Sequence, residues 1–147
     1  MTHPFIQHLL KDHETQRKLA KKLSEANSAE EKRDYRQSLY DALYPHIEGE
    51  DASIFKYLKD VEGEAHAGAL EAIQEHHVDR LLLDELMTMD LDDENLIAKA
   101  KVLKEINGHH LDEEEEEHFP KLVELADDHK LNELFEAYES AEENFRS

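Results

Sequence analysis

The sequence predicts an all-α protein, an antiparallel up-down four-helix bundle followed by a short fifth helix. The 147 residues include only four glycines and three prolines, so few positions break a helix. Helix-forming Ala, Leu, Glu and Lys dominate the rest of the chain. Four long segments carry apolar residues at helical spacing and are joined by short connections, which favours antiparallel neighbours. We expect a single domain over residues 1–147, with the bundle over about 4–122.

The first two helices have recognisable beginnings. Pro4 occupies a favoured first-turn position, and the first helix extends to about Asn27. Ser28 and Glu31 have the spacing of a capping box, which begins the second helix. Pro45 lies inside that helix, so we expect a kink or a loosened turn there. The residues on the apolar face of the first helix are Phe5, Leu9, Leu10, Leu19, Ala20 and Leu23.

The remaining helices follow the same periodicity. We expect the third over about 65–89, a turn and cap at 90–93, and the fourth over about 94–117. The Phe119–Pro120 pair predicts the end of the fourth helix. A shorter amphipathic helix is expected over about 131–145.

Composition excludes several classes of function. A formal charge of −20 repels phosphate backbones, so we expect no nucleic-acid partner. No stretch approaches the roughly 18 apolar residues of a membrane span, and residues 1–10 lack the pattern of a secretory signal, so we expect a cytoplasmic protein without a membrane partner. The absence of cysteine excludes thiolate zinc sites, iron–sulfur clusters and thiol nucleophiles.

Two matched segments pair a histidine with a glutamate. Glu50 follows His46 by four residues, and Glu114 follows His110 by four. In both segments a Phe follows the histidine by nine residues and a Leu follows it by twelve. The offset between the segments is 64 residues throughout.

Two further histidines repeat in the same way. His13 and His76 are 63 residues apart, and each follows an acidic residue. Their apolar neighbours match at five positions, from four residues before to ten residues after the histidine. The chain therefore consists of a helix with one histidine and a helix with a His-x-x-x-Glu pair, and then the same two helices again.

This spacing indicates a metal centre. Residues four apart lie on one face of a helix, and the apolar neighbours of these side chains turn that face toward the core. Buried imidazoles and carboxylates are costly as isolated polar groups, and a metal ion removes that cost. A mixed set of nitrogen and oxygen ligands suits iron, and less exclusively manganese or zinc. The predicted metal ligands are His13, His46, Glu50, His76, His110 and Glu114.

Neighbouring polar residues leave some alternatives open. His77 could replace His76 or join it as a ligand, although the repeat favours His76. In the acidic run 113–117 only Glu114 has the phase of a ligand, and we expect most of the run to form a solvated helix face. Tyr40 and Tyr44 could donate hydrogen bonds near the site or simply pack in the core. The histidines expected at the surface or beside the ligands are His3, His8, His66, His109, His118 and His129.

The motifs together resemble the hemerythrin-like HHE cation-binding family. They are Asp12-His13, His46-x-x-x-Glu50, Glu75-His76 and His110-x-x-x-Glu114 with Phe119-Pro120. The resemblance implies two non-haem iron ions with an oxo or hydroxo bridge, and Glu50 and Glu114 as bridging carboxylates. It also implies that the site binds O2 or a related ligand. Oxygen-carrying members use one more histidine, so an open position here favours ligand activation or sensing.

Three functions are compatible with such a centre. The first, which we favour, is a non-enzymatic di-iron protein that binds O2, NO or peroxide for sensing, storage or redox response. The second is a di-iron enzyme for peroxide breakdown, in the manner of a catalase, or for NO chemistry. The third is an iron-sensing or partner-binding module. For the first, we expect an apolar shell of Leu, Ile and Phe to limit solvent access and slow autoxidation.

Overall fold

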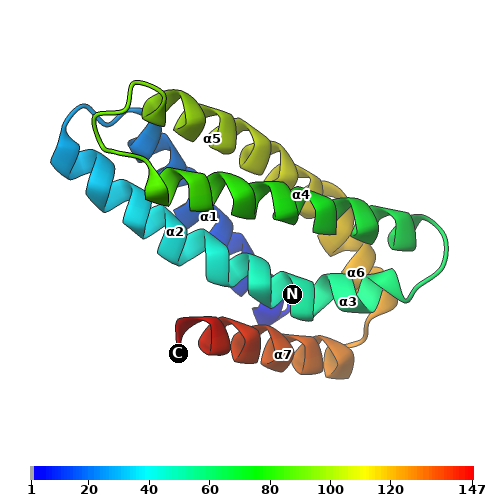
Figure 1. Cartoon of the computed structure of the whole chain (residues 1–147). Coiled ribbons are helices and arrows are strands. Elements are labelled where there is room, and N and C mark those ends of the chain that lie inside the picture. The colour runs from blue at the N-terminus through cyan, green and yellow to red at the C-terminus, as the bar shows by residue number, and fades with distance from the viewer. Residues whose placement is uncertain (1) are drawn as a thin grey trace.

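Four long helices form an antiparallel bundle, which confirms the predicted fold class (Figure 1). The computed structural model describes residues 2–147, and all regular structure in that range is helical. The first helix packs against the second and the last of the four, and the third packs against the same two. The four helices are α1 (Pro4–Ser24), α2 (Ala29–Ala52), α4 (Glu64–Thr88) and α5 (Leu96–Glu113). Within residues 2–147, no helix is both long and apolar enough to cross a membrane.

Four further elements complete the chain. The short helix α3 (Ile54–Lys59) follows α2, and a π-helical segment η1 (Glu114–His118) leads from α5 into α6 (Phe119–Leu125). The C-terminal helix α7 (Asp128–Arg146) is slightly longer than predicted. It lies along the side of the bundle and packs mainly against α2 (Figure 1).

Capping explains where α2 and α4 begin. The Ser28 hydroxyl accepts a hydrogen bond from the Glu31 N–H at 3.1 Å, as the capping-box pattern predicts. The Glu31 carboxylate in turn accepts one from the Asn27 N–H at 3.3 Å. Gly63 precedes α4 with φ of +80°, a conformation that glycine adopts without a steric cost.

The two helices that carry the His-x-x-x-Glu pairs lose their regularity just beyond the glutamate. The α2 helix continues through Pro45 and ends at Ala52, where Ser53 leaves the helical region with φ of −124° and ψ of −83°. The corresponding point on the other helix is η1, where the Phe119 N–H bonds the Glu114 carbonyl five residues back. The break on α2 comes three residues after Glu50, and the π-helical segment begins at Glu114 itself.

The predicted stop at Phe119–Pro120 is wrong, because the chain remains helical to Leu125. Pro120 lies in the first turn of α6, where a backbone N–H needs no partner within the helix. In a regular helix Phe119 would lie about 180° around the axis from His110. The wider turn of η1 shifts this phase, and the Phe119 side chain is buried.

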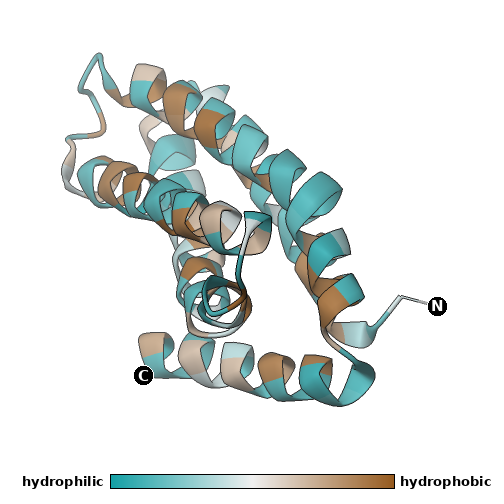
Figure 2. Ribbon diagram, turned by 90° about the vertical axis from the view of Figure 1, so that its right-hand side faces the viewer, coloured by the Kyte–Doolittle hydropathy of each residue, from teal (hydrophilic) through white to brown (hydrophobic). Residues whose placement is uncertain are grey.

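The core consists of two hydrophobic clusters with the six predicted ligands between them. Hydrophobic and hydrophilic segments are interspersed along the helices (Figure 2). Leu10 was expected to face the core but is 36% exposed. One cluster includes Phe5, Leu9, Phe55, Ala72, Phe119 and Leu122. The other includes Leu23, Leu39, Leu43, Leu83, Leu86 and Leu103.

Candidate metal centre

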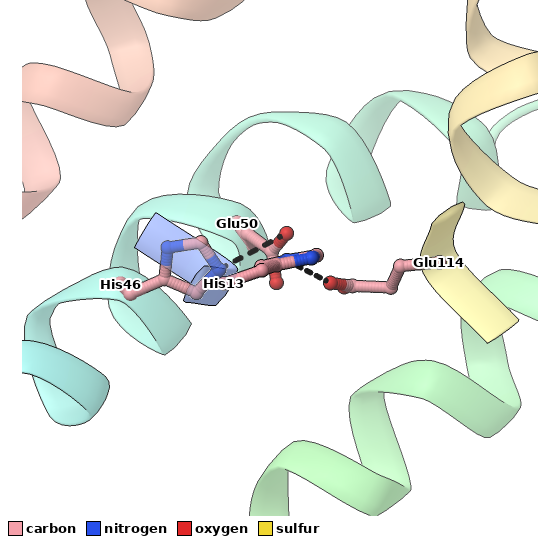
Figure 3. Close-up of side chains that lie close together, drawn as sticks. All are labelled: His13, His46, Glu50 and Glu114. Atoms are coloured by element: carbon pink, nitrogen blue, oxygen red, sulfur yellow. Dashed lines mark ion pairs between the residues drawn. The ribbon is translucent and has the colours of Figure 1, made fainter. Parts of the chain in front are cut away.

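Six buried side chains, from the four long helices and η1, converge in the middle of the bundle. They form two groups of four, and within each group one ligand atom per residue lies within 4.8 Å of the others. Glu50 and Glu114 belong to both groups. The first group is His13, His46, Glu50 and Glu114, and the second is Glu50, His76, His110 and Glu114. In Figure 3 the first group's side chains point toward one another. All six are the residues that the sequence repeat singles out.

Glu50 turns one carboxylate oxygen toward each group. Its Oε2 lies 3.4 Å from Nε2 of His46, one turn earlier on α2. Its Oε1 lies 3.2 Å from Nε2 of His76 on α4. The same carboxylate thus faces an imidazole nitrogen of the first group with one oxygen and of the second group with the other.

Glu114 does the same from the start of η1. Its Oε1 lies 3.0 Å from Nε2 of His13, and its Oε2 lies 3.1 Å from Nε2 of His110. The Nε2 atoms of His76 and His110 are 2.9 Å apart, so both nitrogens of the second group point to one spot. The two glutamates therefore have the orientation of carboxylates that span two cations.

The donor set fits metal ions. All six side chains are at most 1% exposed. Five of their polar atoms lack a hydrogen-bond partner: Nε2 of His13 and His46, both oxygens of Glu50, and Oε1 of Glu114. Buried polar atoms without partners are costly, and a cation between them would satisfy nitrogen and oxygen lone pairs together. The absence of thiolates and the mixed imidazole and carboxylate donors match the ligand preferences of iron.

Every one of the four imidazoles is held by a carboxylate on its other nitrogen. A carboxylate that accepts from Nδ1–H fixes the tautomer and leaves the Nε2 lone pair for a metal. The pairs are His13 with Glu115 at 2.7 Å, His46 with Asp12 at 3.0 Å, His76 with Asp51 at 2.6 Å and His110 with Glu75 at 2.9 Å. Each partner is adjacent in sequence to a ligand on a different helix.

Two arginines anchor two of these carboxylates. Arg17 donates to Glu115 at 2.8 Å and to Asp112 at 2.8 Å. Arg80 donates to Asp51 at 2.6 Å, and its Nε donates to a second acidic residue on α2 at 2.9 Å. The arginines are 63 residues apart, so the repeat extends beyond the ligands to the residues that orient them.

The electrostatics reflect this network. Burial alone would lower the pKa of His46, but the charge of Glu50 and the hydrogen bond to Asp12 raise it to about 10. For His76 burial again opposes the charged form, and hydrogen bonds to Asp51 and Glu50 raise its pKa to about 9. The hydrogen bond from His110 lowers the pKa of Glu75. The imidazoles of His46 and His76 are therefore protonated at neutral pH without metal. A metal ion that binds Nε2 must displace the proton on that nitrogen.

Tyr138 of α7 reaches the first group from outside the repeat. Its hydroxyl donates to Asp12 at 2.8 Å and lies 2.7 Å from Nδ1 of His46. The ring fits against Gly49, where an added Cβ would come within 2.5 Å of it. Tyr138 is fully buried, so α7 is docked directly onto the outer side of the candidate centre.

Several residues lie away from the site or were missed. His77 is exposed on α4 and belongs to neither group; within residues 2–147 no fifth histidine does. Tyr40 and Tyr44 pack with Phe145, with ring centroids 6.3 and 4.8 Å from it. Glu115, in the acidic run expected to be mostly solvated, is only partly exposed and accepts hydrogen bonds from His13 and Arg17, a role that the sequence pattern did not indicate. The other histidines expected outside the site are all at least partly exposed.

The surroundings of the ligands differ on their two sides. On the α3 side the walls are apolar: Phe119 stacks on His13 and Phe55 packs edge-on against His76, each with centroids 5.4 Å apart. On the other side, buried polar residues separate the ligands from the second cluster. One is Asp79, where burial raises the pKa to about 7. The expected apolar shell is therefore present on one side only.

A four-helix bundle with two buried His/Glu groups defines a metal-binding helical domain. The family model for the hemerythrin HHE cation binding domain matches residues 5–122. The chain therefore belongs to the hemerythrin HHE cation-binding family. Comparisons with curated proteins and with solved structures give no match.

Proposed function

We propose that the protein is a non-haem di-iron protein that binds O2, NO or peroxide for sensing, storage or a redox response. The observation that carries this proposal is the orientation of Glu50 and Glu114. Each carboxylate directs one oxygen to each histidine pair, an arrangement that suits two adjacent cations rather than one. Carboxylate-bridged metal pairs are a common use of a helical-bundle core.

The chain supplies the ligands and their orientation. In this proposal His13 and His46 bind one ion through Nε2, and His76 and His110 bind the other. When bound, a pair of iron ions supplies one- and two-electron redox chemistry with small oxygen and nitrogen ligands. The outer carboxylates keep each imidazole in the tautomer that metal binding requires. The six residues are buried, so the surrounding core shields them from bulk water.

Anaerobic loading with iron(II) tests this proposal. We expect uptake of about two ions per chain, followed by distinct optical changes on adding O2, peroxide or NO. Stable, reversible spectra favour a binding function, whereas continued consumption of peroxide or NO favours an enzyme. Uptake of one ion, or of none, would contradict the di-iron proposal.

A second candidate function is iron sensing through α7. The observation that favours it is the Tyr138 hydroxyl, which contacts both His46 and the Asp12 carboxylate that orients it. Metal binding at the first group would remove a proton from His46 and change its charge. The helix α7 contacts His46 through Tyr138 and lies at the surface, so it could pass this change on to a partner. Hydrogen exchange of residues 128–146 with and without iron tests the link, and equal exchange rates in the two states would exclude it.

A further inference from the structure

A second layer of buried polar residues lies one helical turn from the ligands. Gln16, Asp79 and Asn107 each lie three residues from a candidate ligand histidine, on α1, α4 and α5. They are 0%, 0% and 3% exposed. Leu43 holds the fourth position of this layer. The layer separates the candidate metal centre from the second hydrophobic cluster, where a core would otherwise be apolar.

The hydrogen bonding of this layer is incomplete. The Asn107 amide donates to the Gln16 carbonyl at 3.2 Å. Nε2 of Gln16, Oδ1 of Asn107 and both oxygens of Asp79 have no partner. Turning both amides over would still leave one NH2 donor and one carbonyl acceptor unpaired. Unpaired buried polar groups are costly, so these atoms indicate a partner other than the protein itself.

A cavity connects this layer to solvent. It lies between α1 and α5, has a volume of about 300 Å³, and is lined by Gln16 and Asn107. Lys21, Lys104 and Gly108 lie on the same lining, and both lysines are exposed. The cavity therefore borders two residues with unpaired amide groups, each one turn from a candidate ligand, His13 or His110.

We propose that this cavity admits hydrogen peroxide and that Gln16 and Asn107, which line it, bind the molecule beside the metal centre. The inference rests on the proposed function and selects one ligand class from it. O2 and NO offer no hydrogen to donate, and an apolar wall would serve them. Hydrogen peroxide both donates and accepts, which matches the unpaired NH2 group of Gln16 and the unpaired carbonyl of Asn107.

Replacing the amides tests the binding layer. In iron-loaded protein, Asn107→Leu should leave the iron content unchanged and raise the half-saturating concentration of hydrogen peroxide about ten-fold, as expected for the loss of one hydrogen bond. Azide carries no proton at neutral pH, and its half-saturating concentration should change far less. Equal effects on peroxide and azide, or no effect on either, would overturn the inference.

A second readout needs no metal. The double variant Gln16→Leu/Asn107→Leu removes both unpaired amide groups, so the metal-free protein should melt at a higher temperature than the wild type. Residues that serve only the fold would give the opposite result. A lower melting temperature would therefore contradict a role in ligand binding.

The access route is tested at Gly108, which leaves the polar layer intact. A Cβ added there meets nothing within 4 Å, so Gly108→Phe can fill the cavity mouth without disturbing the core. This variant should slow the reaction with peroxide several-fold, whereas Gly108→Ala is the matched control and should react at the wild-type rate. Equal rates in both variants would exclude this route, even if an amide variant fails to fold.

The failures of the two proposals are distinguishable. If the wild type takes up no pair of iron ions, the proposed function fails and the peroxide site fails with it. If all variants load iron normally and their peroxide constants match the wild type, only the inference fails.

Discussion

The Tyr138 hydroxyl lies 2.7 Å from Nδ1 of His46, a contact between the C-terminal helix and a predicted metal ligand 92 residues earlier. The hydroxyl also donates to Asp12, so tyrosine, carboxylate and imidazole form one small network. Asp12 and His46 match Glu75 and His110 in the sequence repeat, but Tyr138 lies outside it, because α7 has no counterpart in the other half. Tyr138 makes the two ends of the pseudo-twofold site unequal, and it ties the first group to an element at the surface.

The docking of α7 depends on the absence of a side chain at Gly49. Gly49→Ala would place Cβ 2.5 Å from the Tyr138 ring, so we expect a loss of about 1–3 kcal/mol in the free energy of unfolding from overpacking. Chemical denaturation of the metal-free protein measures it. Gly108→Ala is the control, since its Cβ meets no atom and alanine favours the helix. A Gly49→Ala variant as stable as Gly108→Ala would contradict this packing.

The outer carboxylates should tune metal affinity. Glu115→Gln keeps the shape of the side chain but weakens its hold on Nδ1 of His13, so we expect iron affinity to fall about 10–100-fold. Competition with a chelator of known affinity measures this change. Glu116→Gln removes the same charge from the exposed neighbouring position and should bind iron like the wild type. Equal affinities in the two variants would show that the outer hydrogen bond is unimportant.

The metal-free protein should lose stability at high pH. The folded-state pKa values of His46 and His76 are raised to about 10 and about 9, above the ordinary value of 6.5. The protonated forms therefore stabilise the fold fully below about pH 6.5, and this contribution disappears as pH rises through 9 to 10. Urea unfolding between pH 6 and pH 10 measures it. A His46→Gln/His76→Gln variant should show a flatter profile, and matching profiles would contradict the assigned shifts.

The sequence repeat predicts the six candidate ligands because local rules determine their positions. His46 and Glu50 share a helix face through their spacing, and apolar neighbours turn that face to the core. The same spacing does not predict which carboxylate accepts a hydrogen bond from each imidazole. Asp51 and Glu115 occupy equivalent positions in the repeat, yet assigning them to His76 and His13 requires knowing which helices are neighbours.

Other features depend on packing that no local pattern encodes. Pro120 predicts a helix end, but a wider turn at residues 114–118 carries the helix past it. Tyr138 has ordinary amphipathic spacing within α7. Its hydroxyl reaches Asp12 and His46 because Gly49 has no side chain to obstruct the ring. Gln16 and Asn107 lie on core-facing positions, where polar residues are unusual. Their place on the apolar faces of α1 and α5 is visible in the sequence, but the spacing of the histidines does not indicate it.

Iron content per chain tests the central claim most directly. Wild-type protein loaded anaerobically and desalted should contain about two iron ions, because two carboxylates span two histidine pairs. Glu114→Ala and His46→Ala should each abolish binding of the pair, whereas His77→Ala, at an exposed position beside His76, should keep both ions. Unchanged iron content in Glu114→Ala and His46→Ala would contradict the assignment of the metal centre.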